Sequence, residues 1–507
     1  MSASARSLTE SRLGKKSAPV IEEAVITPRL AGPNGELRMF DAFLQVDLAH
    51  VTMLAERAIL PGTAARDLMR GLLRLRDAGA GALSIDPALG TMLLQIENWL
   101  TREVGQNASG MLQLARSRID QGPAIIRVLV RDRLLTTLTG LLDLQQTLLL
   151  RAREWRDVIM PGYTHLQHSQ PWVLGHYLLA QHDAFARDVE RLFQTYARVN
   201  RSALGAAAMS GTSWPIDRRR TAALLGHPEV IVNSKDASFI NGMDFLPELA
   251  ANLSILVANA GRLGSDLYLW STWEFGMVDL DASLCGTSSI MPQKKNPYAL
   301  ERLRALSGEA LGWMPAQLGL LRSPSSTDCD VNFASNHYLG YFDATQWVLR
   351  LTDESVRTLA IDRARMLERA AANWTTASDL ADRIVRAADL DFRRAHHVVG
   401  LLVRRATEAG RAPASIRSAD VDAAAQEVLG KPLHLPDDLV RDALDAERFV
   451  RTRVSEGSVH PDEVGKQLLQ AEDLLARERS RLAAEQARLA TARAELERAA
   501  RAVAALD

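Results

Sequence analysis

The chain has 507 residues, a formal net charge of −1 and a hydrophobic fraction of 47%. A nearly neutral chain has no bulk attraction to nucleic acid or to a membrane surface, so we expect neither as a partner. Two cysteines, Cys285 and Cys329, are too few for a disulfide framework or a cysteine-based metal site. These features predict a globular protein of about three domains in the cytoplasm, with no cofactor and no metal.

Apolar residues recur at helical spacing along most of the chain. Residues 1–36 are polar and are predicted to form a disordered tail. Residues 37–121 are predicted to form an N-terminal helical domain, 122–372 a central bundle of long helices and 373–473 a C-terminal helical domain. No stretch of about twenty uncharged apolar residues occurs, so no transmembrane helix is expected. The predicted fold class is therefore all-α, with three helical domains.

One segment of the central region carries apolar residues at alternating spacings of four and three. They are Leu249, Leu253, Leu256, Ala260, Leu263, Leu267 and Trp270. Such a narrow stripe is suited to packing one long helix on another, and we interpret it as a core stripe. Stripes of this kind on long helices also suggest a bundle formed between subunits.

The last part of the chain has an apolar residue every seven positions, at Leu468, Leu475, Leu482, Leu489, Leu496 and Val503. The second core position of a coiled coil is polar or alanine here, and it includes Arg479, Gln486 and Arg493. Half a seam does not support a strong coiled coil. Residues 474–507 are therefore predicted to form an extra charged helix, which docks on the protein or pairs weakly between subunits.

Residues 281–301, DASLCGTSSIMPQKKNPYALE, differ from the helical sequences on both sides. One glycine and two prolines within twelve residues exclude a continuous helix. A loop rich in hydroxyl and cationic groups between long helices is suited to binding or catalysis. On composition alone, a solvated surface loop is the simpler interpretation.

The order of the residues favours the functional interpretation. SSIMPQKKNP resembles the signature of the argininosuccinate lyase/fumarase/aspartase superfamily, Gly-Ser-Ser-x-x-Pro-x-Lys-x-Asn-Pro, with Thr287 in place of the glycine. Residues 114–121, LARSRIDQ, resemble the family's first conserved segment, Thr-Ala-Arg-Ser-Arg-Asn-Asp-Gln. Residues 162–167, GYTHLQ, resemble its second segment, and residues 211–218 resemble a supporting segment, Gly-Thr-x-x-Pro-Ile-Asp-Arg.

This resemblance implies a β-elimination next to a carboxylate, usually with release of fumarate. By position, Ser288 corresponds to the general base, and Lys294 and Asn296 to groups that stabilise the charge that develops on the carboxylate. His165 corresponds to the family's site histidine, which is paired there with a glutamate that falls on Glu301. The implied substrate contacts are Ser117, Arg118, Thr164, Gln170, Ser289 and Asn296. The resemblance also implies a homotetramer with a central twenty-helix core, in which each site combines segments of three subunits.

Two departures from the family pattern concern the substrate. Ile119 replaces an asparagine that contacts the succinyl half, and residues 323–345 contain nothing like the Tyr-x-x-Asp-x-Gln-Glu-x-Lys segment that holds the arginine half. The prediction is a carbon–nitrogen lyase that acts on an N-substituted aspartate and releases fumarate or a related unsaturated acid. A catalytically weak scaffold, or an elimination or cycloisomerisation of a non-succinyl acid, are the alternatives.

Overall fold

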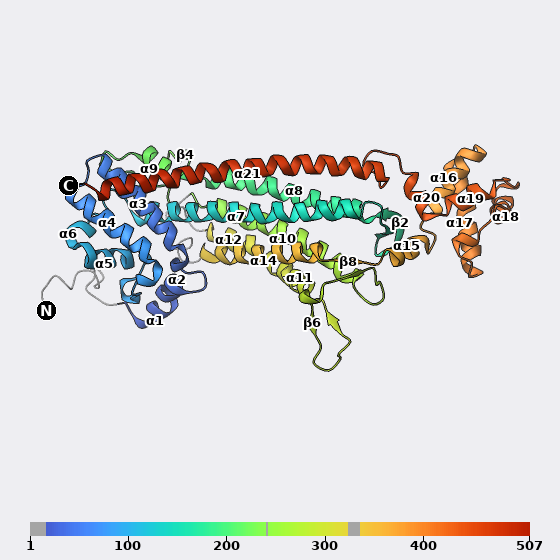
Figure 1. Cartoon of the computed structure of the whole chain (residues 1–507), viewed down its shortest axis with the longest axis horizontal. Helices are drawn as coiled ribbons and strands as arrows, with labels where there is room; N and C mark the ends of the chain where they lie inside the picture. Colours follow the sequence, from blue (N-terminus) through green and yellow to red (C-terminus); the bar gives the residue numbers. More distant parts are fainter. Residues whose placement is uncertain (1–16, 240–241, 323–334, 507) are drawn as a thin grey trace.

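The computed structural model describes residues 17–239, 242–322 and 335–506. A helical unit lies at each end of an elongated molecule, and long helices join the two units (Figure 1). The strands of the described residues form only four two-stranded pairs. This architecture confirms the predicted all-α fold class. No helix in the described part of the chain is both long and apolar enough to cross a membrane.

The long helices of the middle region surround one continuous hydrophobic core. They are α7 (Arg118–Glu154), α8 (Leu174–Val199), α10 (Phe245–Trp270), α11 (Tyr298–Glu309), α12 (Trp313–Leu320) and α14 (Tyr338–Arg357), with the short turn η7 (Ala310–Gly312) between α11 and α12. All seven residues of the predicted stripe lie on α10 and are buried. The core-stripe interpretation is therefore confirmed.

The second inference, a bundle formed between subunits, stays a prediction, and the burial bears only on which side chains would form it. Because its side chains are covered within one subunit, the stripe is not available for packing between subunits. Large apolar side chains are instead exposed on the neighbouring elements, where Leu311 of η7 is 76% exposed and Leu318 of α12 is 49% exposed. An assembly face in this region would be built from those side chains.

A proline suits the first turn of a helix, so the apolar spacing after Pro123 predicts a helix start there, but α7 begins five residues earlier, at Arg118. Ser117 and Asp120 form a capping box, in which the Ser117 N–H donates to Asp120 Oδ1 at 2.8 Å. Pro123 lies inside the helix and has no N–H to donate to the Ile119 carbonyl. The Phe239 N–H donates to that carbonyl instead, at 3.2 Å. The capping box thus sets the start of the helix, and the proline frees an acceptor for a distant segment.

The N-terminal unit consists of short helices around α3 and α4. Its elements are α1 (Pro19–Ile21), η2 (Glu22–Ile26), α2 (Thr27–Ala31), η3 (Glu36–Met39), α3 (Phe40–Glu56), α4 (Gly62–Ala78), η4 (Ala80–Ala82), η5 (Pro87–Leu89), α5 (Met92–Val104) and α6 (Gln106–Ser109). The predicted disordered tail is wrong for residues 17–36. Leu30 is buried in the core, and Arg29 Nε forms an ion pair with Glu36 Oε1 at 2.6 Å. These contacts fix the segment on the N-terminal unit.

The C-terminal unit has a hydrophobic core of its own, separate from that of the bundle. Its elements are α16 (Ala377–Ala388), α17 (Phe392–Glu408), η9 (Pro413–Ser415), α18 (Ser418–Leu429) and α19 (Asp437–Ala443). Helices α15 (Arg363–Ala371) and α20 (Ala446–Arg451) lie between this unit and the bundle (Figure 1).

Helix α21 (Pro461–Ala504) runs along the bundle from the C-terminal unit to the N-terminal unit (Figure 1). All six residues of the seven-residue repeat are buried against the same chain. The polar positions that weaken the coiled-coil pattern contact α7. Arg479 donates to Asp143 at 2.9 Å, Gln486 to Thr139 at 3.4 Å and Arg493 to Asp132 at 2.6 Å. The helix therefore has a complete seam, half apolar and half polar.

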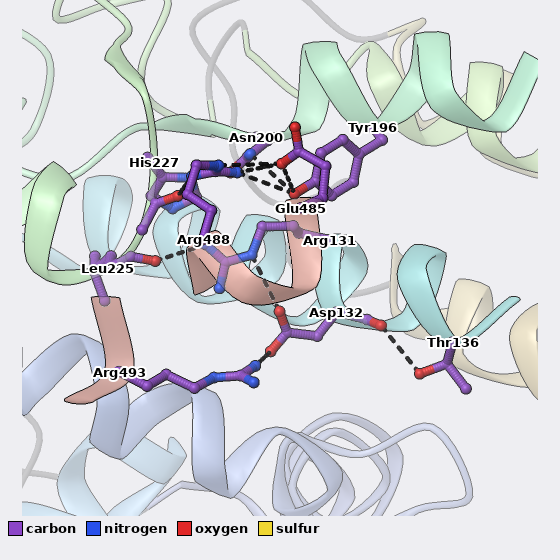
Figure 2. A network of polar contacts seen from close by, with 11 residues as sticks. Arg131, Asp132, Thr136, Tyr196, Asn200, Leu225, His227, Glu485, Arg488 and Arg493 are labelled. Carbon is purple, nitrogen blue, oxygen red and sulfur yellow. Dashed lines mark hydrogen bonds and ion pairs between the residues drawn. The ribbon is translucent and has the colours of Figure 1, made fainter. Parts of the chain in front are cut away.

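A partly buried polar network fixes the middle of α21 (Figure 2). The Tyr196 hydroxyl of α8 donates to Glu485 Oε2 at 2.9 Å and accepts from Arg488 at 3.1 Å. Arg131 of α7 is fully buried and donates to the Leu225 carbonyl at 2.6 Å. Burial and the neighbouring arginines hold the pKa of His227 well below its ordinary value of 6.5, so this histidine is neutral.

The strands and remaining short elements form the loops around the long helices. β1 (Ile159–Thr164) and β2 (Gln167–Val173) make an antiparallel hairpin after α7, and β6 (Gly286–Thr287) and β7 (Lys295–Asn296) make a second one after α10. The other elements are β3 (Arg201–Ser202), α9 (Arg218–Leu224), β4 (Glu229–Val230), β5 (Val278–Asp279), η6 (Ala282–Leu284), η8 (Ser335–His337) and β8 (Ala360–Ile361).

Candidate active site

The first conserved segment forms the N-terminus of α7. Ser117 is the N-cap residue, and its Oγ accepts from the Ile119 N–H at 3.3 Å. The guanidinium-bearing side chain of Arg118 is exposed. Asp120 is buried, and its Oδ2 accepts from the N–H groups of Gly205 and Ala207 at 2.8 and 3.0 Å. Asp120 thus ties the start of α7 to the loop that follows β3.

Burial raises the pKa of Asp120, and hydrogen bonds from the N–H groups of Ser117, Gly205 and Ala207 oppose this shift. Arg116, which also matches the family segment, has a structural role. Its guanidinium forms a fully buried ion pair with Asp47 at 2.7 Å. The motif therefore combines two anchoring groups, Arg116 and Asp120, with an accessible pair, Ser117 and Arg118.

The second conserved segment is the turn of the β1–β2 hairpin. Thr164 ends β1, and His165 and Leu166 form a two-residue turn with φ values of +57° and +56°. Two left-handed residues in succession are typical of a type I′ turn, in which asparagine and glycine are favoured. For other L-residues this conformation costs roughly 1–2 kcal/mol each. Strain of this kind, on an exposed tip where Leu166 is 73% exposed, is typical of a functional or contact position.

The base of this hairpin is rigidly anchored. Tyr163 packs edge-on against His168, with ring centroids 5.3 Å apart, and also contacts Phe275. Burial and the nearby Arg369 lower the pKa of His168. The Gln170 amide donates to the Ser378 hydroxyl of the C-terminal unit at 2.9 Å. Gln170 therefore joins the hairpin to that unit, and Thr164 and His165 extend beyond the anchored part.

The third conserved segment is the β6–β7 hairpin, which projects from the body of the molecule (Figure 1). Ser288 Oγ accepts hydrogen bonds from the N–H groups of Met291 and Ile290, at 3.1 and 3.4 Å. Ser289 and Lys294 are exposed, and within the described residues the Lys294 ammonium has no ion-pair partner. Lys295, by contrast, is paired with Asp279 at 2.8 Å.

Two residues explain the backbone of this loop. Gly286 pairs with Asn296, and a Cβ at position 286 would lie 2.0 Å from the Tyr298 ring, so only glycine fits there. Thr287 replaces the family's glycine within β6, and its φ is not in the left-handed region. A β-branched residue is well suited to a strand, so the replacement is compatible with the hairpin.

The three segments do not form one site within a single chain. Ser117 and Thr164 lie at opposite ends of the 37-residue helix α7, which is about 55 Å long at 1.5 Å per residue. His165 and Glu301, the implied pair, are both exposed and form no ion pair with each other in the described structure. The family's arginine-binding segment has no counterpart in residues 323–345 of the sequence. Of this stretch, residues 323–334 lie outside the described residues.

Sequence reasoning missed the role of Asp120 and the contribution of residues 29 and 36 to a pocket beside Arg118. The Ser-x-x-Asp spacing of a capping box was the available signal for Asp120. Arg218, in the segment expected to support the site, donates to the Leu204 carbonyl at 3.0 Å and to the Ile231 carbonyl at 2.8 Å. It thereby holds the loop whose N–H groups bind Asp120.

The chain is similar to known lyases over most of its length. Residues 51–312 match the lyase family model, and residues 374–451 match the argininosuccinate lyase C-terminal model. An argininosuccinate lyase of Methanothermobacter thermautotrophicus is 37% identical over 87% of this chain and 94% of its own length. An argininosuccinate lyase of Methanocorpusculum labreanum is 37% identical over 90% of this chain and 92% of its own length.

Among solved structures, an EDDS lyase variant with bound fumarate superposes with a TM-score of 0.86 and 32% identity, covering 98% of both chains. The unmatched 2% is smaller than residues 474–507, so this relative has a counterpart for much of that region. The helix over residues 474–507, which was predicted to be extra, is therefore not extra with respect to this relative. A muconate lactonizing enzyme from Pseudomonas putida, at 19% identity and a TM-score of 0.66, shares the fold. The chain belongs to the argininosuccinate lyase family and is a carbon–nitrogen lyase.

Proposed function

We propose that the protein eliminates an amine from an N-substituted aspartate and releases fumarate or a related unsaturated acid, with Ser288 as general base. The observation that carries this proposal is the environment of Ser288 in the matched signature. Two backbone N–H groups donate to its Oγ. Hydrogen bonds donated to an oxygen stabilise its alkoxide form more than its hydroxyl form, which is what a serine base requires.

The reaction needs four further side chains besides Ser288. Ser288 removes the proton from the carbon next to one carboxylate, a double bond forms, and the C–N bonding electrons leave with the nitrogen. Lys294 and Asn296 stabilise the charge that builds up on the carboxylate oxygens. His165, assisted by Glu301, protonates the leaving nitrogen or orients the substrate. Lys294 is suited to its role because, unlike Lys295, it has no carboxylate partner within the described residues.

The acid half of the substrate is assigned to Ser117, Arg118, Thr164, Gln170 and Ser289. Arg118 is exposed at the N-terminus of a long helix, where the helix dipole adds to the attraction for a carboxylate. Gln170 is hydrogen-bonded to Ser378, so it contacts substrate only if that bond is exchanged.

These groups act together only if several chains contribute to one site. The separation of Ser117 and Thr164 along α7 supports composite sites in a homotetramer. The exposed apolar side chains of Leu311 and Leu318, and the exposed Leu166 at the hairpin tip, are suited to contacts between subunits.

The natural amine is not arginine in this proposal. Ile119 removes a hydrogen-bonding group from the acid half, a loss typically of about 1–3 kcal/mol, and the arginine-holding segment is missing from the sequence. The test is to incubate purified protein with fumarate and a panel of amines, and separately with argininosuccinate. We expect adducts with some amines and little turnover of argininosuccinate. A kcat/KM for argininosuccinate at or above about 10⁴ M⁻¹s⁻¹ would overturn the substrate assignment.

A further inference from the structure

A pocket opens beside the segment that we assign to the acid half of the substrate. Arg118 and Gln121, three positions apart and therefore on one face of α7, form part of its wall. Six apolar side chains form much of the rest, namely Met39, Phe43, Leu93, Ile125, Ile126 and Phe239. The pocket is partly open to solvent, so a substrate held at Arg118 can extend into it.

The wall next to Arg118 depends on three residues at the start of α7. A Cβ on Gly122 would lie 2.2 Å from the Phe239 ring, so glycine is needed for the ring to lie against α7. The Phe239 N–H donates to the Ile119 carbonyl, which is free because Pro123 has no N–H. Ile119 is also the residue that replaces the family's asparagine. Ile119, Gly122 and Pro123 thus jointly place an aromatic ring where the acid-binding segment meets the pocket.

The charges lining the pocket disfavour a cationic ligand. Its described lining contains two arginines, Arg29 and Arg118, and one carboxylate, Glu36. Glu36 is almost fully buried and already satisfied, because it accepts from Arg29 at 2.6 Å and from the Met92 N–H at 2.8 Å. A second ammonium or a guanidinium in the pocket would leave water without gaining a free counter-charge.

We propose that this pocket receives the amine half of the substrate and selects amines with an apolar substituent over amines with a second cationic group. The inference rests on the proposed function, since it assumes that the acid half binds at Ser117 and Arg118. It extends that function by naming the class of amine. Apolar side chains gain from covering an apolar substituent, whereas a cation in the pocket meets no free carboxylate among the described lining residues.

The test compares n-pentylamine with cadaverine, which has the same carbon chain and a second ammonium group at its far end. Each amine is added with fumarate to the full-length protein, and formation of the N-substituted aspartate is followed. We expect kcat/KM for n-pentylamine to exceed that for cadaverine by at least about tenfold, the effect of one unpaired polar group. Equal rates, or faster addition of cadaverine, would overturn the inference while leaving the proposed function intact.

If neither these amines nor any other amine of a broad panel adds to fumarate or to a related unsaturated acid, the proposed function fails and the inference fails with it. A matched pair of variants gives a second test. Leu93→Glu places a carboxylate in the pocket and should reverse the preference toward cadaverine. Leu94→Glu, on the neighbouring residue of α5 outside the pocket lining, should keep the wild-type preference. A reversal in both variants, or in neither, would contradict the assignment of the pocket.

Discussion

The seam beneath α21 and the three conserved segments are built in opposite ways. Along α21 nearly every group has its partner in the same chain, from buried leucines to the network of Tyr196, Glu485 and Arg488 (Figure 2). The conserved segments instead leave the side chains of His165, Ser289 and Lys294 exposed, one of them on a strained turn. The seam completes the fold of the chain, whereas in the proposed function the conserved segments act only when several chains contribute to one site.

Variants in the seam should therefore change stability, whereas variants in the conserved segments should change activity. The largest effect is expected at Ser288. Ser288→Ala removes the proposed base, so turnover should fall by about 10²–10⁴-fold, the usual contribution of a positioned base. The free energy of unfolding should stay within about 0.5 kcal/mol of wild type, because the residue lies on a projecting loop. Steady-state kinetics and urea unfolding measure the two quantities.

Ser283→Ala is the matched control for that experiment. Ser283 lies in the same loop and donates to Asp281 Oδ1 at 2.6 Å, but it does not match the family signature. Its replacement should leave turnover nearly unchanged. If Ser288→Ala retained turnover near the wild-type level, Ser288 would have no part in the mechanism.

The second prediction concerns the seam. Leu489 is 2% exposed and packs beside Gly226, so Leu489→Ala should lower the free energy of unfolding by about 2–5 kcal/mol. Leu469→Ala is the control on the same helix, because Leu469 is 66% exposed and its truncation should cost little. Urea unfolding of the two variants checks the difference. Equal effects would mean that α21 is not packed on the bundle as described.

The smallest effect is a pH dependence of stability. Burial, Arg131 and other nearby arginines hold the pKa of His227 in the folded state well below 6.5. Below pH 6.5 the unfolded chain binds a proton at this histidine and the folded chain does not, so its contribution to stability falls with falling pH. Well above pH 6.5, the contribution is constant. The slope below that pH is about 1.4 kcal/mol per pH unit.

His227→Gln removes this titration. Because the other titrating groups are the same in wild type and variant, their effects cancel in the difference between the two. Between pH 5 and 6.5, the difference in unfolding free energy between wild type and variant should therefore shrink as pH falls. A difference that is constant with pH, or that grows toward pH 5, would show that His227 is not held neutral in the folded protein.

The sequence predicted those parts of the molecule in which pattern and packing agree. Helical spacing identified the stripe from Leu249 to Trp270, and prolines identified the loop that contains Ser288. It did not predict the start of α7, because Pro123 was interpreted as a helix start while the Ser117–Asp120 capping box was overlooked. Residues 1–36 were assigned to a tail because the chain begins with a polar stretch, although Leu30 and the Arg29–Glu36 ion pair fix the later part of this segment in place.

For a related reason, the sequence predicted the apolar contacts of α21 but not its polar contacts. The second core position of the heptad is polar at Arg479, Gln486 and Arg493. Polar residues at this position argue against a coiled coil when the sequence is judged alone. In the structure each contacts a polar group of α7, and such partners cannot be identified from α21 alone. For the candidate site, the residue types were predictable from the motif. Their separation in one chain required the length and direction of α7 to be known.

The account depends most on the claim that the active site is shared between chains. The direct measurement is complementation between His165→Ala and Ser288→Ala, co-expressed with different tags and purified as mixed oligomers. Each variant alone should be inactive, and random mixing should restore roughly a quarter of wild-type activity, because a site is intact when both contributing chains supply the native residue. Mixed oligomers that remain inactive, or an active wild-type monomer, would contradict the claim.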